Sequence, residues 1–337
     1  MKQHLLPQTR QIKANLHCHT TLSDGRLTPE EVKAAYKAHG YGVVAFTDHE
    51  YIVPHLELAD ESFIPLTAYE YSINEAPSPG KENWSFRRCF HLNFYARDPK
   101  NDVHVCFDPK AVRGPGAAVA DTLRYTGELY HRDYRDVRHV IDEHVKNGFL
   151  CCLNHPFWSL QTHDDYFGLE GLFAMEVYNT GCSVFSGETW NDYTLFTDNG
   201  HTDVGPVAAD DNHNACGEPF GHGALGDSFG GYTMLCTDDF SYAGVIDALD
   251  KRNFYASTGI DIAELSLENG TLHAAFTPCT HAIAYFGGRL WEQHTDPNGL
   301  TGADFRLPDG ARYARLYLVD LRNGRKATTR AYDLPKE

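Results

Sequence analysis

The chain has 337 residues, of which 42% are hydrophobic and 22% are charged, and its formal net charge at pH 7 is −17. This ordinary globular composition excludes a collagen-like chain and wholesale disorder. No apolar run approaches the ~18 residues that a membrane-spanning helix needs, so no membrane association is expected. A surface this acidic repels phosphate backbones, which argues against binding to extended nucleic acid.

The cysteine content points to a reducing compartment. The nine cysteines are an odd number, and they lie mostly in apolar runs without a CxxC pattern. The first twenty residues also lack an apolar stretch of secretory length. We therefore expect a cytoplasmic protein. The sequence carries no signal for its oligomeric state.

Strand-like and helix-like segments alternate from residue 12 to about residue 257, as in an α/β domain. Residues 12–18 are typical of a strand. Thr28, Pro29 and Glu31 then supply an N-cap, a proline in the first turn and a capping-box glutamate, which predict the start of a helix. Residues 43–46 form the next expected strand. This order with short connections predicts a parallel sheet.

The alternation continues along the chain. A helix is expected over 132–147, with Val137, Ile141 and Val145 on its apolar face. The segment 74–131 is expected to hold a loop-rich insertion, because much of it is rich in Pro, Gly and Ser or has no clear pattern. Further strands are expected over 63–73, 89–97, 149–156, 172–179 and 203–213.

The pattern changes near residue 258. Two Asn-Gly pairs, Asn269-Gly270 and Asn323-Gly324, each lie between runs of strand-forming residues. Asn-Gly in this setting is a strong signal for a β-hairpin. We therefore expect two domains, an α/β barrel over 1–257 and a small antiparallel β domain over 258–337.

Histidine, aspartate and glutamate residues stand at or near the C-terminal end of nearly every expected strand of the first domain. In a barrel of parallel strands these ends form one face, so the side chains should converge. His17 and His19 are two apart on a strand and should point to one side, with Cys18 on the other. The converging set is His17, His19, Asp24, His49, Glu70, His91, His155, Asp211 and His213.

Six imidazoles and three carboxylates gathered without cations would be strongly disfavoured, because buried carboxylates repel one another. Imidazole and carboxylate ligands suit Zn, Fe and Mn. Nine such ligands favour two or three divalent ions, and a charge of about +6 would leave a positive pocket suited to phosphate. For each residue taken singly, structural hydrogen bonding at a strand end is the alternative.

These motifs, in this order, resemble the PHP (polymerase and histidinol phosphatase) superfamily of metal-dependent phosphoesterases. The stretch Asn-Phe-Tyr-Ala-Ser-Thr-Gly before a β-rich tail also resembles stand-alone members. The resemblance implies an α/β fold, a distorted (β/α)7 barrel with a small C-terminal antiparallel β domain. The motifs are His17-x-His19, Ser23-Asp24-Gly25, Thr47-Asp48-His49, Glu70, His91, Asn154-His155-Pro156 and Asp211-x-His213.

By this resemblance the site would be a trinuclear metal centre with Glu70, Asp211 and His213 as its catalytic residues. Histidinol phosphatases of the family usually carry histidine where Asp24 stands, which argues against histidinol phosphate as the substrate. The implied ligand sets are His17, His19, Glu70 and Asp211 for one ion, Glu70, His91 and His155 for a second, and Asp24, His49 and His213 for a third.

The implied activity is hydrolysis of a small phosphorylated metabolite or nucleotide, a mono- or diester, by metal-activated hydroxide. Arg87 and Arg88 shortly precede His91 and are candidate substrate-binding residues, because guanidinium groups bind phosphate oxygens. One alternative is a metallo-amidohydrolase, which commonly has a bridging carbamylated lysine that the strand ends here do not offer. Another is a non-catalytic, metal-stabilised PHP module.

Several neighbouring residues have two interpretations. Glu176 either supports a ligand histidine or makes an ordinary hydrogen bond of the core. Asp48 is expected to orient a neighbour, and for Asp210 orientation and ligation both stay open. Trp84 either covers the pocket or packs on its own domain. His222 is expected to be a solvated residue of a glycine loop.

Overall fold

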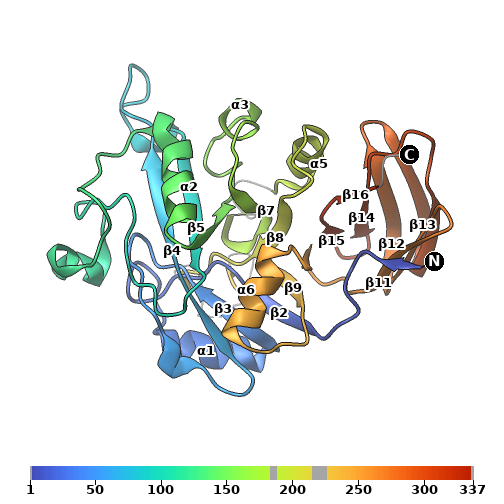
Figure 1. Ribbon diagram of the computed structural model, residues 1–337, viewed down its shortest axis with the longest axis horizontal. Helices are drawn as coiled ribbons and strands as arrows, with labels where there is room; N and C mark the ends of the chain where they lie inside the picture. The colour runs from blue at the N-terminus through green and yellow to red at the C-terminus, as the bar shows by residue number, and fades with distance from the viewer. Residues whose placement is uncertain (1, 183–187, 215–225, 335–337) are drawn as a thin grey trace.

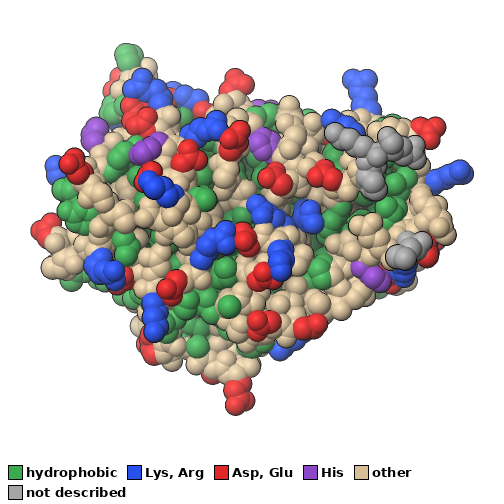
Figure 2. Space-filling view, in the orientation of Figure 1, with side chains coloured by type: hydrophobic (Ala, Val, Ile, Leu, Met, Phe, Trp, Pro, Cys, Tyr) green, Lys and Arg blue, Asp and Glu red, His purple; other side chains and the backbone are tan. Residues whose placement is uncertain are grey.

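The computed structural model describes residues 2–182, 188–214 and 226–334. An α/β part holds most of the chain, and an antiparallel β part lies to one side of it (Figure 1). Within the described ranges, no helix combines the length and the apolar character that a membrane crossing requires. On the face shown in Figure 2, Lys and Arg side chains are interspersed with Asp and Glu.

Seven strands form a distorted barrel. The strands β2, β3 and β4 are parallel, and so are β6, β7 and β8, whereas β5 is antiparallel to both of its neighbours. Backbone hydrogen bonds join the ends of β8 and β2: His19 N donates to Asn212 O (3.1 Å) and Asp211 N donates to His17 O (2.9 Å). The expected barrel is therefore confirmed. Its strands are Gln11–Asn15, Tyr41–Phe46, Ile64–Asn74, Cys89–Ala96, Phe149–Leu153, Leu172–Asn179 and Gly205–Ala209.

Helices cover the outside of the barrel (Figure 1). The helix α1 (Pro29–Ala38) begins with the expected capping box, in which Glu31 N donates to Thr28 Oγ1 and Thr28 N donates to Glu31 Oε2. The capping box satisfies backbone donors that the first helical turn leaves open. Further helices in the described part of the chain include α2 Val137–Lys146, α3 His163–Tyr166, α5 Trp190–Asp198 and α6 Tyr242–Asp250.

The helix α2 differs from the sequence-based expectation at its start and on its buried face. It begins at Val137 after a 3₁₀ turn over Tyr134–Asp136, not at residue 132. Its buried face holds Val140, Ile141 and His144, whereas Val145 is 40% exposed. With 3.6 residues per turn, Val145 lies further round the helix than the face that packs on the barrel.

The insertion between β4 and α2 contains the strand β5 and is otherwise built of turns. Its 3₁₀ turns cover Trp84–Phe86, Gly114–Ala118 and Ala120–Thr122. The segment after β5 packs through a small hydrophobic cluster made of Phe107, Val112 and Ala120 with the half-buried Tyr51. This part of the chain is thereby attached to the loop that follows β3.

The antiparallel part confirms both expected hairpins. Residues Glu268 and Thr271 pair directly across Asn269 and Gly270, whose φ values are +51° and +75°. Positive φ at both central positions is what a two-residue type I′ turn requires. The second hairpin has a four-residue loop, because Asp320 pairs with Arg325 across residues 321–324.

The barrel and the antiparallel part share one continuous sheet. The strand β9 (Tyr232–Cys236) pairs with β2 and with β10 (Phe254–Ser257), and β10 pairs with β15 of the C-terminal sheet. The N-terminal strand β1 (Gln3–His4) adds to β11. The remaining strands are β11 Ile262–Glu268, β12 Thr271–Gly287, β13 Leu290–Arg306, β14 Tyr313–Asp320, β15 Arg325–Thr329 and β16 Tyr332–Asp333.

Separate hydrophobic cores support the two parts. Ala14, Val43, Leu66 and Val207 belong to the barrel core, and a second core lies in the C-terminal sheet. The eight cysteines in the described part of the chain are all buried, as the sequence indicated; Cys216 lies outside that part.

Candidate metal centre

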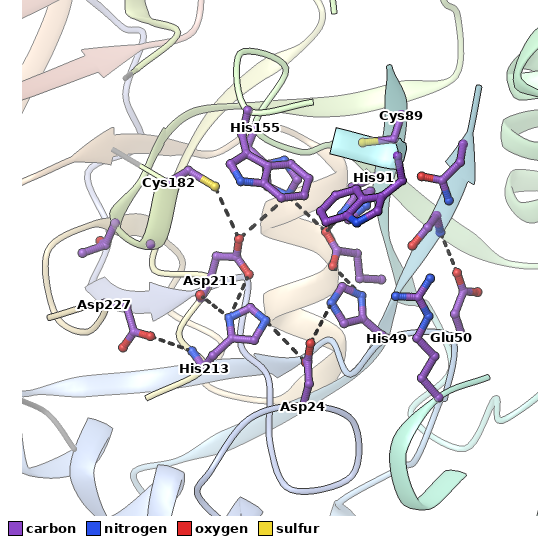
Figure 3. Close-up of a pocket in the computed structure, with 18 of the residues that line it drawn as sticks. Asp24, His49, Glu50, Cys89, His91, His155, Cys182, Asp211, His213 and Asp227 are labelled. Atoms are coloured by element: carbon purple, nitrogen blue, oxygen red, sulfur yellow. Dashed lines mark hydrogen bonds and ion pairs between the residues drawn. The ribbon is translucent and has the colours of Figure 1, made fainter. Parts of the chain in front are cut away.

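The nine candidate ligands gather at one mouth of the barrel. His17 and His19 lie in the segment after β2, His49 follows β3, and His155 follows β6. The other members are Glu70 in β4, His91 in β5, Asp211 and His213 after β8, and Asp24 in the loop after β2 (Figure 3).

His91 corrects the expectation that the ligands stand near the C-terminal ends of their strands. It is the third residue of β5, which starts at Cys89. Because β5 runs antiparallel to β4 and β6, its N-terminal end lies at the mouth where the parallel strands end. The direction of one strand thus brings His91 to the same place.

His17 and His19 point to the same side of the chain, as their spacing predicts. Their Nε2 atoms lie 3.2 Å apart. His17 Nε2 is also 3.3 Å from Glu70 Oε1 and 3.2 Å from Asp211 Oδ1, and His19 Nε2 is 3.0 Å from Asp211 Oδ1. Cys18, on the other side, belongs to a hydrophobic cluster.

Glu70 is the shared centre of the group. Its Oε1 lies 3.0 Å from His91 Nδ1 and 3.2 Å from His155 Nε2. Its Oε2 lies 2.9 Å from His49 Nδ1. The Glu70 side chain is 1% exposed, so a carboxylate with imidazoles on both oxygens is almost fully removed from water.

Asp24 stands at the open side of the cluster. Its Oδ1 is 3.8 Å from His19 Nδ1 and 3.4 Å from His213 Nε2, and its Oδ2 is 3.6 Å from His49 Nε2. The side chain is 56% exposed. The loop residue therefore completes a group whose other members come from the ends of β2, β3 and β8.

The donor set fits cations. Each of four overlapping groups offers ligand atoms that lie within 4.8 Å of one another. The Nδ1 atom of His19 is buried without a hydrogen-bond partner. Imidazole nitrogens and carboxylate oxygens crowded in this way suit several divalent metal ions. The groups are His19–Asp24–His49–His213, His17–His19–Glu70, His17–His155–Asp211 and Glu70–His91–His155.

All nine expected ligands occur in these four groups. The groups overlap at His17, His19, Glu70 and His155, so the assignment of ligands to three separate ions stays a prediction. The same holds for the catalytic roles expected of Glu70, Asp211 and His213.

The charges of the cluster are set by burial and by its neighbours. Burial opposes ionisation of Glu70, but His91, His17 and His49 hold its pKa well below the usual value. Burial likewise opposes ionisation of Asp211, and His17 and His19 hold its pKa well below the usual value. Burial, together with the nearby His213 and His49, lowers the pKa of His19 to about 3. The carboxylates are thus ionised and His19 is neutral. Despite burial, the nearby carboxylates in turn raise the pKa of His17 and of His91 well above the usual value and that of His213 to about 9, so a metal ion would displace protons from these rings.

Glu176 supports two ligand segments at once. Its Oε1 lies 2.8 Å from His17 Nδ1, and its Oε2 accepts a hydrogen bond from His155 N (3.0 Å). Asn179 Nδ2 donates to Glu176 Oε2 and to Asp211 Oδ2, both at 3.1 Å. Of its two interpretations, the geometry therefore favours support of a ligand histidine.

Asp48 and Asp210 hold the ligand loops through backbone and hydroxyl donors. Asp48 accepts hydrogen bonds from Thr20 N (2.8 Å), Thr20 Oγ1 (2.8 Å) and Ser23 Oγ (2.7 Å), and so shapes the turn that carries Asp24. Asp210 accepts from Tyr36 Oη, Thr180 Oγ1 and the backbone N–H groups of residues 229–231. Both carboxylates orient their neighbours, and neither belongs to one of the four groups.

A cavity of about 660 Å³ opens over the cluster. Trp84 and Arg87 line it, and Arg87 Nε donates to Lys81 O (2.8 Å). Arg88 does not line it, because its guanidinium is held by Glu75 Oε1 (2.8 Å) and Asp165 Oδ1 (2.7 Å). The structure thus brings only the first of the two expected arginines to the cavity.

Other residues of the cavity were not expected from the sequence. Trp158 lines the wall, with its ring centroid 5.3 Å from that of His91 and 5.2 Å from that of His155. Its position three residues after His155 was the available signal. Arg113 also lines the cavity and carries no signal, because it lies in a segment without periodicity. His222 lies outside the described residues.

No protein-family model and no curated protein matches the sequence. Among solved structures, the chain is similar to a two-domain protein from Bacteroides vulgatus that contains a predicted PHP-like metal-dependent phosphoesterase. The two share 15% identity over 97% of this chain and 96% of that one, with a TM-score of 0.47.

Two further solved structures are similar to this chain. A putative metal-dependent phosphoesterase from Bifidobacterium adolescentis has 16% identity over 64% of this chain and 92% of its own, with a TM-score of 0.39. An amidohydrolase from Chromobacterium violaceum with bound sulfate has 17% identity over 59% of this chain and 87% of its own, with a TM-score of 0.36.

Proposed function

We propose that this protein is a metal-dependent phosphoesterase of the PHP type that hydrolyses a small phosphorylated metabolite or nucleotide. The observation that carries the proposal is the position of Glu70, whose two oxygens face His91, His155 and His49 beneath an open cavity. Buried ligands that overlap around one carboxylate are typical of a multinuclear centre, and such centres catalyse phosphoryl displacement.

The ligands would hold two or three ions of Mn, Fe or Zn. Bound ions would act as Lewis acids on phosphate oxygens and would lower the pKa of a bound water to near neutral. Glu176 fixes the ring of His17 with Nε2 toward the cluster. Asn154 Nδ2 donates to Glu70 Oε1 (2.9 Å) and so keeps this carboxylate in place.

The second task of the chain is to bind the anionic substrate. The net charge of −17 repels phosphate over most of the surface, so cationic groups must act locally. Arg87 supplies one guanidinium on the cavity wall. The volume of the cavity suits a small molecule. We propose a cytoplasmic location from the cysteine usage.

Two alternatives lead to different measurements. A metallo-amidohydrolase with a bridging lysine would need that lysine at the centre, and none of the described residues that line the cavity is lysine. A non-catalytic metal module tolerates loss of ligands, whereas all nine positions here hold residues able to bind metal.

The test combines metal analysis with a substrate panel. The purified protein is analysed for metal per chain and then assayed for phosphate release from mono- and diesters and for cleavage of amides. We expect bound metal and turnover of a phosphate ester that chelation abolishes and added metal restores. Amide cleavage alone would favour the amidohydrolase, and metal without any turnover would favour the non-catalytic module.

A further inference from the structure

The segment that follows β5 brings a cation to the cavity. Arg113 directly precedes the 3₁₀ turn Gly114–Ala118. Its side chain lines the cavity together with Asp24, His49 and His213, which belong to one candidate metal group. The segment after β5, which is not part of the barrel, therefore contributes to the wall of the cavity.

The backbone beside Arg113 is fixed against the loop that carries Asp24. Gly114 has φ +59°, and a Cβ added there would lie 2.3 Å from the backbone oxygen of Ser23. A side chain at residue 114 would therefore push the two segments apart. Gly116 is also close to a neighbour, since a Cβ there would lie 2.8 Å from Tyr51 Cδ1. Two close approaches hold Arg113 next to the open side of the cluster.

No described residue neutralises the charge of Arg113. In residues 2–182, 188–214 and 226–334, its guanidinium makes no ion pair or hydrogen bond with another side chain or with the backbone. Glu50, which also lines the cavity, is already bound by Arg132 Nη1 (2.6 Å) and Nη2 (2.7 Å). Asp227 accepts hydrogen bonds from His213 N and Asn214 N, both at 2.9 Å.

We propose that Arg113 is a substrate-binding residue that donates hydrogen bonds to the phosphate oxygens at the Asp24 side of the cluster. The inference rests on the proposed function and adds a residue that the sequence pattern did not indicate. A planar guanidinium can bind two oxygens of one phosphate, which a lysine at the same place cannot do equally well. The insertion thus completes the phosphate pocket.

The direct test measures binding of inorganic phosphate to the metal-loaded protein by calorimetry. Loss of a charge-assisted contact in Arg113→Gln should weaken phosphate binding by ~10-fold or more, with a smaller loss in Arg113→Lys. Metal content should be unchanged. The matched control is Arg124→Gln, because Arg124 lies in the same segment and pairs with Asp102 at 2.6 Å.

A second pair of variants tests whether the close approach of Gly114 to Ser23 holds Arg113 in place. Gly114→Ala should displace Arg113 and weaken phosphate binding in the same direction. Gly127→Ala is its control, because Gly127 has φ +69° in the same segment but nothing within 4 Å of an added Cβ. Both alanines carry the strain of a positive φ, so a difference between them reports the contact with Ser23.

Equal phosphate affinity of Arg113→Gln and the wild type would overturn the inference, and so would a metal-loaded wild type that binds no phosphate. Where an ester is hydrolysed, KM for that ester should rise in parallel with the loss of phosphate binding. If no ester is hydrolysed, the proposed function fails, while the phosphate titration still decides the role of Arg113.

Discussion

Glu176 Oε1 and His17 Nδ1 lie 2.8 Å apart, and both side chains are almost fully buried. A proton on Nδ1 would be donated to Glu176, and Nε2 faces His19, Glu70 and Asp211. One carboxylate outside the four candidate groups thereby orients a candidate metal ligand.

Glu176→Gln tests this arrangement. An amide nitrogen facing His17 would favour the tautomer with a proton on Nε2, and in the other orientation it would face His155 N and Asn179 Nδ2, which are both donors. We expect metal affinity to fall by about 10–100-fold, measured by competition with a chelator. The control is Glu264→Gln, a residue of β11 that pairs with Lys2. Unchanged affinity in Glu176→Gln would contradict the supporting role.

Asp211→Asn tests the candidate catalytic carboxylate. Turnover should fall by several orders of magnitude, because a neutral amide replaces an anion that lies close to His17 and His19. The fold should persist, because Asp211 has φ +51° and Asn tolerates this conformation as well as Asp does. Phosphate release and circular dichroism measure the two effects. Retained turnover would refute the assignment.

Asp48→Asn should affect one part of the metal centre. The amide would set an N–H2 group against Thr20 or Ser23, which donate to Asp48 in the native protein. The turn that carries Asp24 would then loosen, and the ion held by the Asp24 group should be lost while the others stay. Metal analysis checks this expectation. Asp24→Asn should give the same loss, so different metal contents in the two variants would contradict it.

His144 predicts a pH dependence of stability away from the metal site. Burial lowers the pKa of His144 to about 3, and Tyr69 Oη lies 2.5 Å from its Nε2. In the unfolded chain the pKa is about 6.5, so the unfolded state binds the extra proton below that pH. The contribution of neutral His144 to the free energy of unfolding is therefore fully present above pH ~6.5. It falls by about 1.4 kcal/mol per pH unit as the pH falls from there toward 3.

The measurement is urea unfolding at several pH values with a chelator present. His144→Gln removes the buried imidazole, so its free energy of unfolding should depend less on pH below 6.5 than that of the wild type. His4→Gln, at an exposed position in β1, is the control and should keep the wild-type slope. If the free energy of unfolding of His144→Gln depended on pH as steeply as that of the wild type, the buried ring would not contribute to the pH dependence.

Features that depend on neighbours along the chain could be predicted from the amino-acid pattern. The capping box of α1 and the Asn269-Gly270 turn use residues whose partners lie within a few positions. The spacing of His17 and His19 likewise fixed their common side, because successive residues of an extended chain alternate. The nine candidate ligands were predicted from polar residues in expected strands and from motifs that resemble a known family, and their binding of metal stays a prediction.

Which distant groups meet depends on how the chain folds and could not be predicted from that pattern. The antiparallel direction of β5 placed His91, and ion pairs with Glu75 and Asp165 removed Arg88 from the cavity. The close approach of Gly114 to Ser23 put Arg113 in the wall of the cavity that Asp24 also lines. These outcomes depend on strand direction and on side-chain partners many residues away, and a pattern of neighbouring residues does not encode either of them.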